Sequence, residues 1–376
     1  MHDPVMNAQR MRGQGYRGRA LAMALFACLF CAVSLSEANG GDEKRSKPRV
    51  VVSSFEPRDL ALQSNLDVGI SIETAVPIQS GTANEMSFRE TEAQLLAAKQ
   101  RLVFEESGQW GVVRLFPAPS VIPELMLTLV VLASDGRELE IQATLTVVNG
   151  DVLLRETYLD RADSAASMSE SEDPFVDLYH RVHADVAQSV SERAFSERHL
   201  EMLSFLRYSR QLAPDVFESY LVTEANRWKL VREPSEQDPM YVRIAKLKAY
   251  ELLFVDTIDE QLTGALGKID VAYRLWLRAS KEQLDWLDLR RERGVNTESF
   301  TNESAFSRHQ AVYAAYRSLK IHEQELFELV LDLESESRST ALEIEDRVVK
   351  LEGTLGQQYR EWRETLSMIV SLENTF

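Results

Sequence analysis

Two histidines, His180 and His183, are the residues whose spacing comes nearest to that of a metal site. Three positions apart on a helix, two side chains project from the same face and can share one metal ion. No cysteine or compact set of carboxylates accompanies the pair, and the other histidines are scattered at His2, His199, His309 and His322. We therefore expect a pair of surface histidines, and we predict no metal-ligating residues.

Paired carboxylates are the second candidate, because a glycosidase or an aspartic protease holds two of them in one pocket with separated pKa values. One group comprises Asp256, Asp259 and Glu260, and a second runs from Glu323 to Glu336 and includes Glu325 and Glu328. Both groups fall on predicted amphipathic helices, where acidic residues usually form a solvated face. The second group also lacks the Asp-x-Asp-x-Asp-Gly loop of a calcium site. We expect neither group to be catalytic.

Patterns typical of other chemistries are missing from the sequence. No serine lies in a Gly-x-Ser-x-Gly elbow, and no glycine-rich loop stands between a strand and a helix to bind phosphate. Four tryptophans fall on or near apolar helical stripes, which favours packing between helices over a ligand cage: Trp228, Trp276, Trp286 and Trp362. We predict no catalytic residues, no cofactor, and a protein that is not an enzyme.

The composition narrows the remaining classes of function. The chain has 376 residues, 44% of them hydrophobic, and carries 42 Lys and Arg against 59 Asp and Glu, a net charge of −17. This hydrophobic content indicates a folded protein, and the length allows two domains. The acidity argues against nucleic-acid binding, because contacts with phosphate need clustered basic residues. It also argues against attachment to anionic lipid by charge alone.

Residues 1–38 are typical of an export signal. Four arginines precede an apolar run at 20–35, and residues 36–38 fit the small-x-small pattern at which signal peptidase cleaves. Both cysteines of the chain, Cys28 and Cys31, lie within this run. We predict cleavage after residue 38 and a mature periplasmic chain without disulfides. The alternatives are an uncleaved inner-membrane anchor and lipidation at Cys28, and membrane association is expected only in those cases.

Residues 49–150 show a period of two, which is typical of β-strands. An Asp-Gly turn at 135–136 joins two apolar runs into a hairpin, and Glu90–Lys99 has the character of a short inserted helix. The predicted strands are Arg49–Val52, Leu66–Ile72, Leu102–Phe104, Trp110–Leu115, Leu125–Leu132 and Leu139–Val147, with the third and fourth paired around Ser107–Gly108. We expect a small antiparallel β-sandwich, preceded by a polar lead-in at 39–48.

The rest of the chain changes character. A serine- and acid-rich stretch at 151–173 is predicted to be a linker, and from 174 to 376 apolar residues recur with the 3.6 period of amphipathic helices. The predicted helices are Val176–Val190, His199–Leu212, Val216–Val231, a long one from Pro239 to Gly294, and another that restarts at Thr297–Ser299 and carries an apolar stripe over Ile344–Ile369. Such lengths favour an elongated α-helical bundle or helical hairpin, so the predicted fold class is α+β.

The order of elements in the first half also resembles a known family. Ser64–Ile72, Val113–Leu115, Pro123–Leu125 and the Ser134–Arg137 turn with its closing strand are similar to the N-terminal periplasmic β-domain of FimV-type proteins. In that family the domain follows a signal peptide in large envelope proteins linked to type IV pilus assembly and polar organisation. The chain departs from the family at Thr146–Gly150, where the family has Leu-Leu-Asp-Pro-Pro, and it contains no peptidoglycan-binding lysin motif. The resemblance implies an exported β-domain over residues 49–150.

These features predict a non-enzymatic scaffold or adaptor of the periplasm or cell envelope that acts through protein–protein contacts. Its partners are expected to be envelope proteins. We expect the β-domain to dock through an exposed edge strand, while the helices hold binding surfaces apart. Two alternatives stay open at this point: an envelope hydrolase with a carboxylate site among the helices, and a structural homo-oligomer built through the helices.

Overall fold

The chain divides into two compact units, Met1–Arg45 and Ser46–Phe376. The computed structural model describes seven stretches of the chain, all of them within the second unit. The described residues are 49–51, 64–76, 83–162, 173–235, 237–294, 302–344 and 347–373. The predicted signal at 1–38, the lead-in at 39–48 and both cysteines lie outside them. No helix in these stretches combines the length and the apolar composition needed to cross a membrane.

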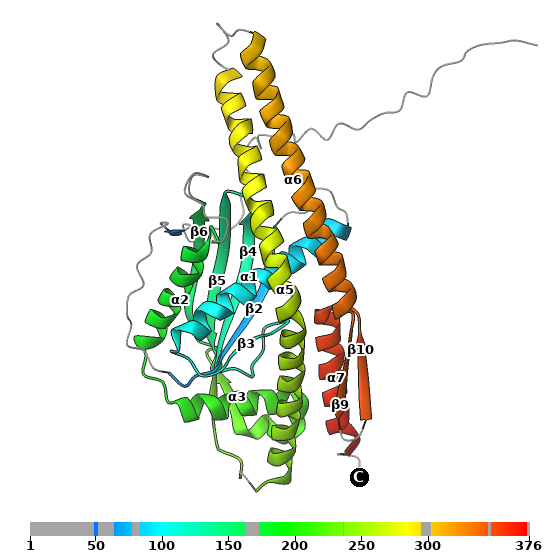
Figure 1. The fold of residues 1–376 in the computed structure, drawn as a ribbon. Coiled ribbons are helices and arrows are strands. Elements are labelled where there is room, and N and C mark those ends of the chain that lie inside the picture. Colours follow the sequence, from blue (N-terminus) through cyan, green and yellow to red (C-terminus); the bar gives the residue numbers. More distant parts are fainter. Residues whose placement is uncertain are drawn as a thin grey trace, which may run out of the picture. The chain divides into compact units, whose positions relative to one another are not determined.

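Six strands form one sheet in which parallel and antiparallel neighbours are mixed (Figure 1). The strands are β1 (Arg49–Val51), β2 (Val68–Thr74), β3 (Val113–Leu115), β4 (Leu125–Ser134), β5 (Glu138–Val147) and β6 (Val152–Arg161). Their order across the sheet is β1-β6-β5-β4-β2-β3. β5 is antiparallel to β4 and β6, whereas β2 is parallel to β3 and β4, and β1 is parallel to β6. The predicted β4–β5 hairpin is confirmed.

The parallel pairs of β2 with β3 and β4 follow from α1 (Ala83–Ser107), a helix of 25 residues that lies between β2 and β3 in the chain. A parallel neighbour needs a crossover connection, and a helix commonly provides one. α1 and α2 (Val176–Ser191) lie side by side on one face of the sheet (Figure 1). Alternate residues of β5 are buried in the core with these helices: Leu139, Ile141, Ala143, Leu145 and Val147.

Three expectations for this half need correction. Leu102–Phe104 is part of α1 and not of a hairpin, because Leu96, Val103 and Phe104 recur at helical spacing and are buried together. Residues 152–161, assigned to the linker, form β6, whose Tyr158 is fully buried. The antiparallel sandwich is not confirmed, since the large sheet of the described residues is mixed and packs against helices.

A short irregular region follows α2. It comprises α3 (Glu197–Leu212), α4 (Pro214–Phe217), the 3-10 turn η1 (Glu218–Tyr220) and a hairpin of β7 (Leu221–Glu224) and β8 (Arg227–Leu230). The helix predicted over Val216–Val231 is therefore wrong. The two turn residues, Ala225 and Asn226, have positive φ angles of 49° and 63°, as a two-residue type I′ hairpin turn requires.

α5 (Pro239–Gly294) is one helix of 56 residues with the boundaries that the sequence predicts. α6 (Asn302–Ser337) packs along its C-terminal half, and α7 (Leu355–Glu373) along its N-terminal half (Figure 1). Trp276 of α5 and Phe327 of α6 both pack on Phe88 of α1, while Phe254 stacks on Trp362 of α7. α5 thus contacts helices from both halves of the sequence.

Between α6 and α7, β9 (Ser339–Ile344) and β10 (Arg347–Glu352) form an antiparallel hairpin. The helical stripe predicted from Ile344 is therefore wrong before Leu355 and confirmed after it. Side chains of β9 alternate between exposed and buried, a period of two that favours a strand. Gly353, which follows β10, has a φ of 106°, a conformation that glycine adopts readily. The predicted restart at 297–299 lies outside the described residues.

Candidate functional site: a groove between the sheet and the long helix

Of the two histidines, His183 has a packing role. The indole N–H of Trp110 donates a hydrogen bond to Nε2 of His183 across 3.2 Å, and the imidazole packs edge-on against Phe104 with ring centroids 4.8 Å apart. Burial, with a smaller contribution from His180, lowers the pKa of His183 to about 4, so this histidine is neutral at pH 7. His183 is therefore not the surface residue that we expected. Nowhere in the described stretches do three His, Cys, Asp or Glu residues gather in a way that could hold a metal ion.

The first group of carboxylates is divided between two arginines. Asp256 pairs with Arg114 across 2.8 Å, and Asp259 pairs with Arg101. Burial raises the pKa of Asp259, and Arg101 opposes this effect. Glu260, the third member of the group, is exposed. Because Asp256 and Asp259 have separate basic partners, the structure does not bring these two together as an acid and a base on one substrate.

The second group makes contacts with its neighbours on α6. Glu323 pairs with Lys320 across 2.5 Å, and Glu328 accepts a hydrogen bond from Gln324 across 3.1 Å. Such contacts between residues three or four apart are typical of a solvated helix face. The tryptophan expectation is confirmed for two residues, since Trp362 is fully buried and Trp276 packs on Phe88.

A buried carboxylate that sequence reasoning missed is Glu92 of α1, which is 2% exposed. Its Oε1 accepts hydrogen bonds from Ser134 Oγ at 2.6 Å and Tyr273 Oη at 2.8 Å, and its Oε2 accepts one from Arg89 at 2.6 Å. The contacts join α1, β4 and α5. The available signal was spacing, because Glu92 stands four residues after Phe88 and four before Leu96 on the apolar face of α1. With both oxygens satisfied, Glu92 is a structural residue.

A second missed cluster contains a lysine beside a serine, a pairing that some hydrolases use for nucleophilic catalysis. Lys248 Nζ lies 3.4 Å from Ser204 Oγ, and burial lowers the pKa of Lys248. Ser204, however, is fully buried and donates its hydroxyl proton to the carbonyl oxygen of Ile122 across 2.6 Å. A nucleophile must be accessible to a substrate, and Ser204 is not. The contacts of Lys248 and Ser204 instead join α3 and α5 to the loop before β4.

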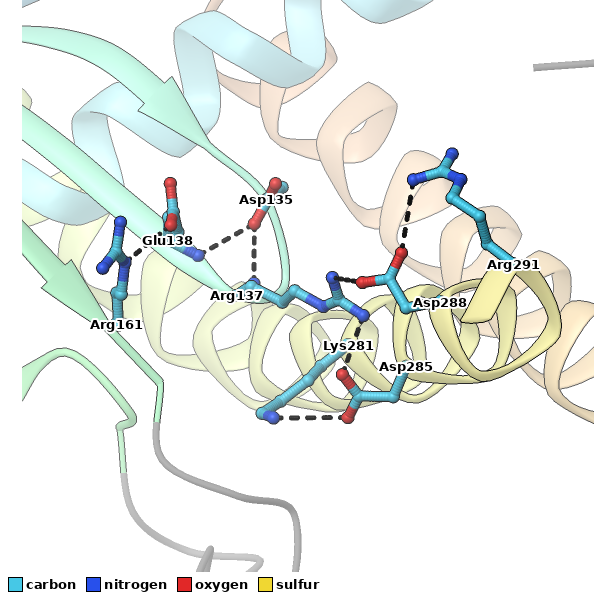
Figure 2. Close-up of polar contacts among 8 residues, drawn as sticks. All are labelled: Asp135, Arg137, Glu138, Arg161, Lys281, Asp285, Asp288 and Arg291. Atoms are coloured by element: carbon cyan, nitrogen blue, oxygen red, sulfur yellow. Dashed lines mark hydrogen bonds and ion pairs between the residues drawn. The ribbon is translucent and has the colours of Figure 1, made fainter. Parts of the chain in front are cut away.

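The turn between β4 and β5 fastens the sheet to α5 (Figure 2). Asp135 Oδ1 accepts hydrogen bonds from the backbone N–H groups of Arg137 at 2.6 Å and Glu138 at 2.8 Å, which fixes the turn. The Arg137 guanidinium then pairs with Asp285 across 2.9 Å and with Asp288. It also lowers the pKa of Asp288.

Gly136 at the tip of this turn lies directly against the helix. A Cβ built at Gly136 would stand 2.5 Å from the carbonyl oxygen of Leu277 and would also meet the backbone nitrogen of Lys281. Glycine is therefore the residue that this close approach requires. Lys281 and Arg291 complete the cluster, since they pair with Asp285 across 3.4 Å and with Asp288 across 3.5 Å.

Two adjoining cavities lie beside α1 and the chain around 353–357. The larger, of about 400 Å³, also borders α5, and the smaller, of about 340 Å³, also borders α6. They share four residues, Glu90, Gln94, Thr354 and Leu355, so we treat them as one and call it the α1–α5 groove. The floor of the larger cavity is apolar, with side chains from β2, from the end of β3 and the residue after it, and from α5: Ile72, Leu115, Phe116, Ile258, Leu262 and Leu266. Volumes of this order are typical of binding sites.

The rim of the groove carries carboxylates of two kinds. Asp259 and Glu334 are paired with Arg101 and with Arg338, the latter across 3.0 Å. Glu73 and Glu90 are exposed, and no other described residue forms an ion pair or a hydrogen bond with their carboxylates. An apolar floor beside two carboxylates without a basic partner makes the α1–α5 groove the strongest candidate site in the described stretches.

Comparison of the chain with known protein families, with curated proteins and with solved structures gives no match.

Proposed function

We propose that this protein is a non-enzymatic scaffold or adaptor that is exported to the cell envelope and acts through contacts with other proteins. The proposal of export rests on the sequence of residues 1–38, with its basic start, apolar run and small-x-small end. A link to type IV pilus assembly or polar organisation rests on the resemblance of residues 49–150 to FimV-type proteins.

The observation that carries the scaffold role is the continuity of α5. Its 56 residues correspond to about 84 Å at ~1.5 Å per residue. Along this length it contacts α3 and α7, then α1 and the sheet, then α6. A helix supported in this way holds the surfaces attached to it at fixed separations, which is what a scaffold needs.

The way in which polar groups are used also supports a role without catalysis. Glu92, Lys248 and Arg137 are buried or paired at junctions between elements, where their contacts stabilise the fold. Polar groups in structural contacts can have shifted pKa values, as catalytic groups do. Here the contacts are made with other groups of the same chain.

Export is tested by alkaline-phosphatase fusions after Gly150 and after Phe376 of the full chain. We expect both fusions to be active and both to lose activity when residues 1–38 are removed. If both full-length fusions are inactive, the proposal of an exported protein is wrong.

The scaffold role is tested by proximity labelling with the full chain in growing cells. We expect repeated labelling of a small set of envelope proteins, and none of it from the chain without residues 1–38. Labelling that does not differ between the two chains would overturn the proposal.

A homo-oligomer is a second candidate, and exposed apolar residues on α6 favour it. Tyr313, Tyr316 and Ile321 are 65%, 45% and 47% exposed. Light scattering of the mature chain 39–376 tests this candidate. A monomer at high micromolar concentration would contradict it.

A further inference from the structure

The edge of β2 is only partly paired in the described structure. β2 covers Val68–Thr74, but β3 pairs with Val68–Ile70 only. β3 ends at Leu115, and the N–H of Phe116 donates to the Ile70 carbonyl across 2.8 Å. The second half of β2 thus has no described strand on this side.

The hydrogen-bond pattern shows which backbone groups this leaves. In a parallel pair, successive residues direct their N–H and C=O groups to opposite neighbours. Val68 and Ile70 bond toward β3, while Ala75 donates to Val131 on the β4 side across 2.8 Å. The alternation therefore directs the backbone groups of Ile72 and Thr74 toward the unpaired edge. Such an edge is a template for one more strand.

This edge opens into the α1–α5 groove. Ile72, Glu73 and Thr74 line its larger cavity, together with Leu262 and Leu266 of α5. An extended segment beside β2 would have side chains that alternate between the two faces of the sheet. One set would enter the apolar floor with Ile72, and the adjacent residues would lie near the carboxylate of Glu73.

The negative charge at the rim of the groove indicates which residues a bound segment should carry. Glu73 and Glu90 have no basic partner among the described residues, whereas Asp259 is already paired with Arg101. A Lys or Arg on the incoming segment would supply the missing positive charge. Carboxylates at a rim contribute to selectivity and to the rate of association more than to affinity.

We propose that the α1–α5 groove binds an extended segment of a partner protein in which apolar residues alternate with Lys or Arg, and that this segment adds a strand to the sheet at Ile72–Thr74. The inference rests on the proposed function, since it names the mode by which the scaffold recognises a partner.

The test measures binding of a labelled peptide, acetyl-Lys-Val-Lys-Leu-Lys-Val-Lys-amide, to the purified full chain by fluorescence anisotropy at low salt. We expect saturable binding that weakens as salt rises. A peptide with Glu in place of Lys is expected to bind at least tenfold more weakly. A peptide N-methylated at its central leucine and at the lysine that follows keeps its side chains but loses the backbone donor that faces β2, whichever direction the segment runs. It is also expected to bind at least tenfold more weakly.

Variants of the chain locate the binding. Glu73→Lys with Glu90→Lys should weaken binding at least tenfold. Glu260→Lys with Glu282→Lys, the same change of charge at two exposed positions of α5 outside the groove, should change it less than twofold. Since all four carboxylates are exposed, the two variants should have equal unfolding temperatures, which shows that weaker binding is not caused by loss of folding.

Three results would overturn the inference: no binding at millimolar peptide, equal binding by the double and the control variants, or equal binding of the N-methylated peptide. Self-association of the wild-type chain that the double variant abolishes would instead assign the groove to a second copy.

If the peptide does not bind while proximity labelling still recovers envelope proteins, this inference is wrong and the scaffold proposal stands. If labelling fails, the scaffold proposal is wrong whatever the peptide does.

Discussion

The sheet meets α5 in two places that differ in how completely they are filled. At the β4–β5 turn, Gly136 has no room for a methyl group and Arg137 pairs with two carboxylates of the helix (Figure 2). At the edge of β2, a cavity of about 400 Å³ lies between the two elements, and Glu73 has no basic partner among the described residues. The comparison indicates that the first contact holds the helix in place, while the second leaves a surface on which another chain can bind.

The largest expected effect comes from adding a side chain at Gly136, where the β4–β5 turn lies directly against α5. Gly136→Ala places a methyl group against the backbone of α5 at Leu277 and Lys281, so either the turn or the helix must move. We expect a loss of about 3 kcal/mol in the free energy of unfolding, at the upper end for overpacking. Urea denaturation followed by circular dichroism measures it.

Gly264→Ala is the matched control, because nothing lies within 4 Å of the Cβ that it adds to the same helix. It should stabilise the protein by about 1 kcal/mol through helix propensity. Equal changes in the free energy of unfolding for Gly136→Ala and Gly264→Ala would contradict the close approach of the β4–β5 turn to α5.

Buried His183 and the Arg137 cluster of Figure 2 should lose stability over different ranges of pH. The pKa of His183 is about 4 when folded, against a usual value near 6.5, so the unfolded chain binds the proton more readily between these values. Stability is therefore full above about pH 6.5 and falls as the pH drops toward 4, by about 2 kcal/mol at pH 5.

Denaturation curves between pH 4 and pH 8 measure this effect. His183→Gln keeps an acceptor for the Trp110 indole but does not titrate, so its curve should lack this fall. The Arg137 cluster acts in a lower range, because the lowered pKa of Asp288 contributes stability that is lost only as the pH falls below its usual value near 3.8. A fall of the same size in His183→Gln would contradict this assignment.

Alanine-to-leucine substitutions compare a filled core with the open groove. Ala143 is fully buried in the centre of the sheet, whereas Ala97 of α1 lines the larger cavity. Ala143→Leu should cost about 2 kcal/mol, since a close-packed core resists added volume. Ala97→Leu should change the free energy of unfolding by less than about 0.5 kcal/mol, because the cavity accepts the side chain.

Thermal unfolding of both alanine variants measures the difference, and peptide binding by Ala97→Leu should be lost. A large destabilisation by Ala97→Leu would mean that the groove has no spare volume.

The smallest expected effect concerns the ion pairs at the turn. Arg137 and its two partners are partly exposed, so Arg137→Met should lower the unfolding temperature only slightly. The difference from wild type should shrink further in 1 M salt, which screens such pairs. A salt-independent loss as large as that of Gly136→Ala would show that charge, rather than close approach, holds the helix.

The sequence allowed prediction of the elements whose signals are local. The Asp-Gly turn with its alternating flanks predicted the β4–β5 hairpin, and Pro239 and Gly294 marked the ends of α5. The short helix predicted at Glu90–Lys99 is confirmed as part of α1, but its full extent was missed because Leu102–Phe104 resembles a strand. β6 was missed because the charged residues of 152–161 resemble a linker, and tertiary packing decides both cases.

The two contacts with α5 were beyond prediction for a similar reason. They depend on which residues distant in the sequence meet, as Arg137 meets Asp288. Nothing in the local sequence separates Glu73, which has no basic partner in the described residues, from the acidic residues that do.

The most direct test of an open edge is hydrogen–deuterium exchange of the full chain, resolved at single residues, with and without the Lys/Val/Leu peptide. In the free chain we predict fast exchange at the amides of Ile72 and Thr74, and slow exchange at Ser71 and Glu73, whose amides face β4. The peptide should slow exchange at Ile72 and Thr74. Amides of Ile72 and Thr74 that are already protected in the free chain, or that the peptide leaves unchanged, would contradict the account.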